Sequence, residues 1–254
     1  MAQSGIPATS RIWVALDDAE CGLAALDAAA ILASRLRAEL RGLFVEDINL
    51  LRLARLPFSQ VVGRASASWR PLDAAELERQ LRGQAARSRA LLSRLAERER
   101  LSWSFHVARG ELVAETLTLS SQGEWVIFGK TWKHLDVDGL APPSQAAVVA
   151  VLDGRAPVEP VLRAARYLRD NPGDALTVVI TAEPADAIAR LRSQAADWLA
   201  EDEGRARFAQ IPTQDLTAWI ARRPGAVVVG GLVSLQPVLQ RLLMETASPL
   251  VLLH

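Results

Sequence analysis

The chain has 254 residues, enough for one large domain or two small ones, and half of them are apolar, which is ordinary for a soluble globular protein. The 29 basic residues balance the 29 acidic ones, so the overall charge does not favour binding to nucleic acid or to an anionic membrane. No apolar run reaches the roughly 18 residues of a membrane-spanning helix, so we expect no membrane insertion. The single cysteine, Cys21, excludes an internal disulfide framework. Residues 1–10 have neither the basic nor the apolar segment of a signal peptide, and we expect a cytoplasmic protein.

The first regular pattern is a β-α-β unit over residues 11–47. An apolar strand, residues 12–16, ends at Asp17, and a small, alanine-rich helix follows over about residues 22–36. A second apolar strand ends at Glu46 and the adjacent aspartate. Short apolar strands on either side of a helix are typical of a parallel sheet. Open parallel sheets bind ligands beyond the carboxyl ends of their strands, where Asp17 and Glu46 are expected to lie.

A loop and a long helix are predicted next. Prolines bracket residues 60–70, which we interpret as a mobile loop because they are rich in Gly, Ser and Ala. Asp73 is a good N-cap for a helix that runs to Arg98. One apolar stripe follows helical spacing: Leu77, Leu81, Ala85, Ser88, Leu92 and Leu95. Residues 52–100 hold eleven arginines and five acids, favouring the solvated side of an amphipathic helix over an anion-binding or partner-binding face.

A Gly-Lys-Thr triplet at 129–131 follows a strand over residues 124–128 and invites interpretation as a phosphate-binding loop. That motif needs a further glycine at position 124, where the chain has Glu124. The residues between form a strand, whereas backbone amides enclose a phosphate only from a loop. We therefore reject a Walker-type phosphate site here.

The pattern then starts again. Residues 134–145 contain Gly and two prolines and are interpreted as a linker between a first lobe (10–133) and a second lobe (146–254). The second lobe repeats the alternation of strands and helices, and its first strand ends at Asp153, as the first lobe's first strand ends at Asp17. This repetition indicates an internal duplication. In an alternative interpretation, residues 146–152 close the first sheet and the second sheet lacks its opening strand.

These residues resemble a known family, the universal stress proteins, in a tandem arrangement. The opening stretch RIWVALDDAECGLAALDAAAILASRLRAELRGLFVED carries the likeness best, and ASPLVLL near the C-terminus is similar to the family's closing turn and dimerising strand. The resemblance implies an α/β fold of two doubly wound parallel-sheet lobes, of the adenine-nucleotide alpha-hydrolase-like type. The first lobe is expected to be truncated after its fourth strand.

The family's ATP-binding members carry Gly-x2-Gly-x9-Gly-(Ser/Thr) after the fourth strand, and neither lobe keeps this pattern. In the second lobe Gly230 and Gly231 remain, and Gln236-Pro237 replaces the distal Gly-Ser. Pro237 also removes one backbone amide. The resemblance implies nucleotide-binding positions at Asp17, Val45, Gly129 and Lys130 in the first lobe, and vestigial ones at Asp153, Gly230 and Gly231. An equally good interpretation of Asp17 and Asp153 is that each caps the helix that follows it.

We therefore predict a non-enzymatic regulatory module of the stress response that needs no cofactor and works through contacts with a protein partner. The alternative is a sensor of ATP or another adenine nucleotide, or a slow ATPase, that uses the first lobe only. His106, His134 and His254 are far apart, and neither a metal-ligand cluster nor a catalytic nucleophile motif is found. A third class, a nucleic-acid binder acting through the arginine-rich helix, is not favoured. Because the first lobe lacks a fifth strand, we expect an exposed edge near Val251 that a second chain covers in a homodimer.

Overall fold

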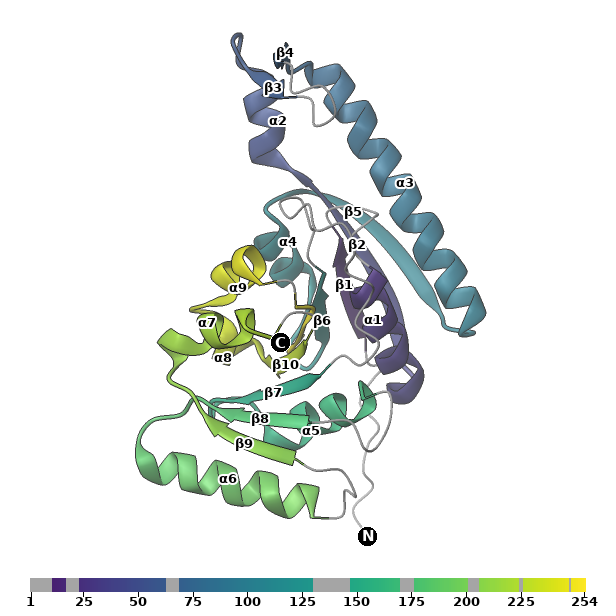
Figure 1. The fold of residues 1–254 in the computed structure, drawn as a ribbon. Helices are drawn as coiled ribbons and strands as arrows, with labels where there is room; N and C mark the ends of the chain where they lie inside the picture. Colours follow the sequence, from purple (N-terminus) through teal and green to yellow (C-terminus); the bar gives the residue numbers. More distant parts are fainter. Residues whose placement is uncertain are drawn as a thin grey trace.

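The structure, a computed structural model, describes residues 11–16, 23–62, 69–129, 147–169, 176–200, 206–223, 226–246 and 248–254. The described residues form one mostly parallel sheet of nine strands, covered by helices, and a separate two-stranded hairpin (Figure 1). In chain order the elements of residues 11–129 are β1 (Arg11–Leu16), α1 (Leu23–Leu36), β2 (Glu39–Asp47), α2 (Ile48–Ala54), β3 (Gln60–Val62), β4 (Trp69–Pro71), α3 (Ala74–Arg98), β5 (Trp103–Gly110), α4 (Leu112–Leu119) and β6 (Trp125–Phe128). Those of residues 147–254 are β7 (Val148–Leu152), α5 (Val158–Tyr167), β8 (Leu176–Ile180), α6 (Ala185–Leu199), β9 (Ala206–Gln210), η1 (Thr213–Asp215), α7 (Leu216–Ala221), β10 (Val227–Gly231), α8 (Leu232–Leu235), α9 (Leu239–Glu245) and β11 (Leu250–Leu253).

The two halves of the sheet, residues 11–129 and 147–254, have the same strand order. The first half reads β5-β2-β1-β6 and the second reads β9-β8-β7-β10-β11. In each half the first three strands are therefore added towards one side of the opening strand, and the fourth strand lies on its other side. β7 pairs with β8 and β10, which assigns residues 148–152 to the second half and rejects the alternative interpretation. The first half has no fifth strand among its described residues, as expected.

The halves meet where β11 pairs with β6, the one antiparallel pair in the nine-stranded sheet of the described residues. Leu250 lies opposite Phe128 and Leu253 opposite Trp125, while the other side of β11 pairs with β10. The expected exposed edge at Val251, and with it a homodimer through the C-terminal strand, is therefore wrong. The missing fifth strand of the first half leaves β6 with a free edge, and β11 of the same chain fills it.

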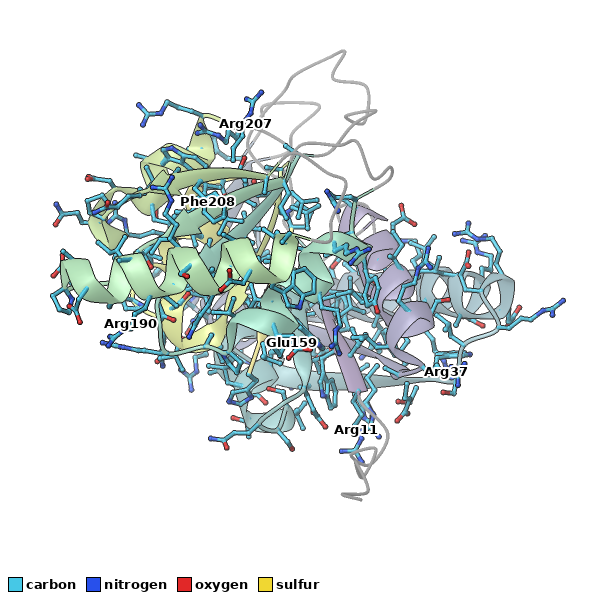
Figure 2. The ribbon with its side chains drawn as sticks, turned by 90° about the horizontal axis from the view of Figure 1, so that it is seen from below. Arg11, Arg37, Glu159, Arg190, Arg207 and Phe208 are labelled. Carbon is cyan, nitrogen blue, oxygen red and sulfur yellow. The ribbon has the colours of Figure 1, made fainter. Side chains whose placement is uncertain are left out.

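Two helical layers cover the sheet because the side chains of each strand alternate between its faces. Ile12 and Val14 of β1 belong to the core under α1, α3 and α5, whereas Trp13 and Ala15 belong to the core under α7, α8 and α9. Charged side chains such as Arg37, Glu159 and Arg190 lie on the outer, solvent-facing side of the helices (Figure 2). None of the described helices combines the length and the apolar character that a membrane span requires.

The long helix α3 matches its prediction. The Oδ1 atom of Asp73 accepts hydrogen bonds from the backbone N–H groups of Ala75 (2.8 Å) and Glu76 (3.4 Å), as an N-cap does. All six residues of the predicted stripe are buried, and Leu92 is fully enclosed against β2. The apolar period of the sequence therefore sets how α3 rests on the first half of the sheet.

The segment between β2 and α3 differs from its prediction. Residues 60–70 were expected to form a loop, but β3 and β4 pair antiparallel, with Val61 opposite Arg70; residues 63–68 lie outside the description. Helix α2 was not predicted, although Asp47 before it is an N-cap residue. Near the C-terminus, α8 ends at Leu235 and α9 begins at Leu239, and Pro237 between them has no N–H to continue a helix. The expected linker 134–145 also lies outside the described residues.

Candidate functional site

The carboxyl ends of β2, β1 and β6 lie side by side, as the family resemblance implies. Leu16 pairs with Phe44, and Ala15 pairs with Phe128, so Val45 near the end of β2 and Gly129 just after β6 lie on either side of the end of β1. Val45 is buried and Gly129 is half-buried. Asp17 and Lys130 lie outside the described residues. The structure thus brings two of the four predicted first-half residues to one edge of the sheet, separated by the width of β1.

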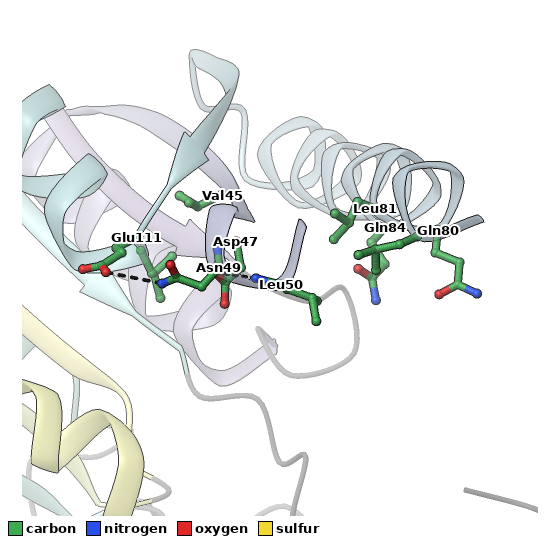
Figure 3. A pocket seen from close by; sticks show the side chains of 10 residues that line it. Val45, Asp47, Asn49, Leu50, Gln80, Leu81, Gln84 and Glu111 are labelled. Atoms are coloured by element: carbon green, nitrogen blue, oxygen red, sulfur yellow. Dashed lines mark hydrogen bonds between the residues drawn. The ribbon is translucent and has the colours of Figure 1, made fainter. Parts of the chain in front are cut away.

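A cavity of about 390 Å³ opens at this edge, beyond β2 and β5 and beneath α3 (Figure 3). Its apolar wall comes from the strand end, α2, α3 and α4, and its polar wall combines carboxylates with carboxamides. The lining residues are Val45, Asp47, Asn49, Leu50, Leu77, Gln80, Leu81, Gln84, Glu111 and Leu112. Val45 is the only predicted site residue among them. The cavity lies one strand further out than the β1–β6 crevice that the sequence indicated.

Both carboxylates of the cavity are already used within the protein. The Oδ1 atom of Asp47 accepts hydrogen bonds from the N–H groups of Asn49 (2.8 Å) and Leu50 (3.3 Å), which caps α2. The Nδ2 atom of Asn49 donates to Oε1 of Glu111 at 3.4 Å and so links the ends of β2 and β5. The sequence signal that was missed is the Asp-x-Asn spacing directly after a strand, which is typical of a helix start.

Next to the cavity, Arg109 forms an ion pair with Glu46. The Nε and Nη2 atoms of Arg109 donate to Oε2 of Glu46 at 3.0 and 2.7 Å, and Glu46 is buried. The hydrogen bond from Arg109 to Glu46 raises the pKa of the guanidinium above its ordinary value. Because this arginine is committed to a carboxylate, it is a poor partner for a ligand phosphate.

The charge of the lining decides which groups fit the cavity. Among the described lining residues there are two carboxylates and three carboxamides, and none is Lys, Arg or His. Phosphate oxygens would be repelled by Asp47 and Glu111, and sites that hold phosphates use cations or converging backbone N–H groups instead. The cavity therefore suits an uncharged, hydrogen-bonding group and disfavours a triphosphate.

In the second half, protein atoms fill the corresponding place. Gly230 and Gly231 end β10 as predicted, but a Cβ built on Gly231 would lie 2.2 Å from Cβ of Ala156 in the loop after β7. The Oδ1 atom of Asp153 accepts hydrogen bonds from the N–H groups of Arg155 (2.8 Å) and Ala156 (3.1 Å), which holds that loop in place. Gly231 thus leaves room for Ala156 of the same chain. Asp153 stabilises a local turn before α5.

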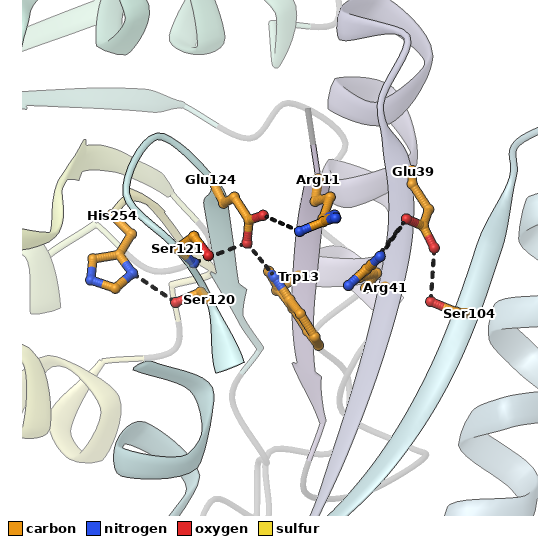
Figure 4. Close-up of polar contacts among 9 residues, drawn as sticks. All are labelled: Arg11, Trp13, Glu39, Arg41, Ser104, Ser120, Ser121, Glu124 and His254. Atoms are coloured by element: carbon orange, nitrogen blue, oxygen red, sulfur yellow. Dashed lines mark hydrogen bonds and ion pairs between the residues drawn. The ribbon is translucent and has the colours of Figure 1, made fainter. Parts of the chain in front are cut away.

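A polar network joins the two halves at the opposite, amino edge of β1 and β6 (Figure 4). Buried Glu124 accepts hydrogen bonds from Nε1 of Trp13 (2.8 Å), Nη1 of Arg11 (3.1 Å) and N–H of Ser121 (3.0 Å). Burial by itself raises the pKa of Glu124, and these three hydrogen bonds outweigh it and lower the pKa below its ordinary value. The N–H of His254 donates to the backbone oxygen of Glu124 at 2.9 Å, which ties β11 to β6.

This network has structural rather than catalytic features. The hydroxyl of Ser120 lies 2.8 Å from Nδ1 of His254, but no described carboxylate hydrogen-bonds to the other ring nitrogen, as a catalytic triad requires. Nor do the described residues contain three His, Cys, Asp or Glu side chains grouped as metal ligands. Cys21 lies outside the described residues. Trp13 and Trp125 are buried in the core.

No family model and no curated protein matches this sequence. Among solved structures, the chain is similar to a universal stress protein from Archaeoglobus fulgidus DSM 4304, with a TM-score of 0.51, 14% identity and 96% of each chain covered. It is also similar to a functionally unknown protein from Pseudomonas aeruginosa PAO1, with a TM-score of 0.45, 16% identity, and 97% of this chain and 92% of that chain covered. The first likeness establishes the fold: a doubly wound α/β architecture like that of universal stress proteins.

Proposed function

We propose that this chain is a tandem universal stress protein that acts as a non-enzymatic regulatory module of the stress response, in the cytoplasm, through contacts with a protein partner. The antiparallel pairing of β6 with β11 supports an internal pseudo-dimer, in which two lobes of one chain meet where two separate chains would otherwise meet. The matching strand orders on either side of this pair support a duplication. The fold alone assigns no activity, so the proposal depends on the sites.

The observation that carries the proposal is the state of the carboxyl edges. In the second half Ala156 lies against Gly231, where a phosphate would need free backbone N–H groups. In the first half the described lining of the cavity includes Asp47 and Glu111 and contains no basic side chain. Both features support the loss of triphosphate binding, and with it the loss of an ATP-driven activity.

Isothermal titration of the full chain with Mg-ATP tests this proposal. We expect no binding at submillimolar ATP, because the described residues at the two edges offer neither the positive charge nor the free backbone N–H groups that the phosphates need. A partner purified with the protein from stressed cells should also remain bound after enzymatic removal of ATP. Stoichiometric, tight ATP binding would refute the proposal.

One observation favours the alternative, an adenine-nucleotide sensor that uses the first half. Val45, which matches an adenine-packing position, lies buried in the wall of the cavity. This alternative predicts that Asp17→Ala abolishes nucleotide binding and that Asp153→Ala leaves it unchanged. Equal effects of the two substitutions, or no binding to the unmodified chain, would exclude it.

A further inference from the structure

We propose that the segment between β2 and α3 docks on the surface of an anionic membrane. The described part of this segment, residues 48–62 and 69–72, is called the protrusion below; it comprises α2, β3 and β4 and projects from the sheet at the N-terminal end of α3 (Figure 1). The inference is independent of the proposed function, because it uses neither the cavity nor a nucleotide. It concerns attachment to the lipid surface, not a helix that spans the bilayer.

The protrusion exposes an unusual amount of apolar surface. Among the described residues eight large apolar side chains are exposed, and four of them lie here: Leu53 (52%), Leu56 (57%), Phe58 (91%) and Trp69 (70%). Single exposed apolar residues are normal, but a group of them on one projecting element marks an interaction surface. The phenylalanine, almost fully in water, has the largest exposed fraction of the four.

The protrusion is held in place by packing and hydrogen bonds, so its exposed side chains are presented by an ordered element. Leu51 and Ala54 of α2 are buried in the same core as Leu77 and Leu81 of α3. Two successive turns follow α2: the N–H of Leu56 donates a hydrogen bond to the backbone oxygen of Leu53 (3.0 Å), and the N–H of Ser59 donates to that of Leu56 (3.2 Å). Thus one side of α2 is anchored on α3, while Leu53 on its other side faces water.

The charge of the protrusion has one sign. Its described residues include three arginines, Arg52, Arg55 and Arg70, and no Asp or Glu. The acids on either side, Asp47 and Asp73, are engaged as N-caps. Arg52 forms no ion pair with a described carboxylate, and Arg55 approaches Glu78 only at 3.7 Å. Beyond Glu76 and Glu78, residues 79–96 of α3 add five exposed arginines and no acid.

A lipid surface matches this combination better than the other candidates. A twofold contact between two copies through the protrusion would bring arginines against arginines. Nucleic acid would use the arginines and the aromatic rings, but it offers nothing to the aliphatic side chains of Leu53 and Leu56. At an anionic bilayer, aliphatic and aromatic side chains enter the interface while the arginines remain at the level of the lipid phosphates. A convex element also needs no matching groove on a membrane.

Co-sedimentation of the full chain with vesicles tests the inference. The vesicles contain phosphatidylcholine alone or phosphatidylcholine with roughly a third of phosphatidylglycerol, which supplies the anionic surface. We expect binding to the anionic vesicles only, weakened by high salt because the arginines are exposed. Equal binding to both kinds of vesicle, or binding to neither, would overturn the inference.

Variants separate the apolar and the charged parts. The double substitution Phe58→Ser with Trp69→Ser should weaken vesicle binding by about tenfold or more, because it removes two interfacial aromatic side chains. Arg52→Gln with Arg55→Gln should weaken binding to anionic vesicles by roughly tenfold. The matched control is Met244→Ser, which replaces an apolar side chain that is 78% exposed on α9, away from the protrusion, and should leave binding unchanged. Circular dichroism checks that each variant is folded.

Three further results would overturn the inference. Vesicle binding that the Phe58/Trp69 variant retains would show that the protrusion is not the contact. A dimer in sedimentation equilibrium that this variant dissociates, without vesicle binding by the unmodified chain, would identify a second copy as the occupant. Salt-sensitive binding of a labelled single-stranded oligonucleotide that competes with the vesicles would assign the arginines to nucleic acid.

Discussion

The carboxyl edges of the two halves show how one strand order can lead to opposite outcomes. In the second half the loop after β7 closes on β10, and Ala156 occupies the space that the missing side chain of Gly231 leaves. In the first half the chain after β2 moves away from the sheet to form α2, the hairpin and α3, and a cavity remains beneath them. The topology fixes where a ligand could bind, but the connections after the strands decide whether space and charge are left for one.

The largest expected effect concerns the helix that forms the roof of the first half. Leu92 is fully buried between α3 and β2, so Leu92→Ala should lower the free energy of unfolding by about 2–5 kcal/mol. Urea unfolding monitored by circular dichroism measures the change. Leu91→Ala, one position along the same helix and only partly buried, is the control and should cost clearly less. Equal losses would mean that α3 does not rest on the sheet through the predicted stripe.

A glycine substitution tests the closure of the second half. Gly231→Ala should destabilise the protein by about 1–3 kcal/mol, because the new Cβ would overlap Ala156. Combining it with Ala156→Gly should restore most of the loss. In the control, Gly83→Ala, the new Cβ meets nothing closer than 3.7 Å within α3 and should stabilise the protein by about 0.5–1 kcal/mol. A neutral Gly231→Ala variant would contradict the close contact and reopen the crevice as a binding site.

The cap of α2 tests whether the carboxylates of the cavity are structural. Asp47→Ala removes the acceptor for the N–H groups of Asn49 and Leu50 and should cost about 1 kcal/mol. Asp47→Asn keeps an acceptor oxygen and should lower the free energy of unfolding by only a few tenths of a kcal/mol. Thermal unfolding of the three proteins gives the comparison. If Asp47→Ala were as stable as the unmodified chain, the carboxylate would be free to meet a ligand.

The smallest effect is a pH dependence at the opposite edge of the first half. The pKa of Glu124 is lowered in the folded protein, so its contribution to stability is complete above the pKa of the unfolded chain, about 4.3. This contribution is lost as the pH falls through the lower, folded pKa. The stability advantage of the unmodified chain over Glu124→Gln should therefore shrink between neutral pH and acid, as measured by urea unfolding at each pH. An advantage that grows towards acid would show that the pKa shift has the wrong sign.

The sequence predicts best where local patterns and burial agree. The Asp73 cap and the stripe from Leu77 to Leu95 place α3, because both depend on neighbouring residues. The doubly wound α/β fold follows from the family resemblance, and the expected truncation of the first half from the absence of a fifth apolar run. Neither expectation required any knowledge of the site.

The misses share a physical cause, which is dependence on contacts distant in sequence. Nothing near Val251 indicates that its strand pairs with β6, more than 100 positions away, so the edge was expected to be open. Gly231 was expected as a vestigial nucleotide-binding position, but nothing in the sequence indicated that Ala156, 75 positions earlier, would lie against it. The cavity was missed because its wall joins residues of β2, α2, α3 and α4, and among them only Val45 was a predicted site residue.

The most direct test of the account is a crystal structure of the full chain grown in millimolar Mg-ATP. We expect clear density for Ala156 against Gly231 and no density for a triphosphate at the carboxyl ends of β1 and β6 or of β7 and β10. Density for three linked phosphoryl groups at either of these places would contradict the account, because it would show that the protein binds ATP without the glycine loop and basic groups on which our interpretation depends.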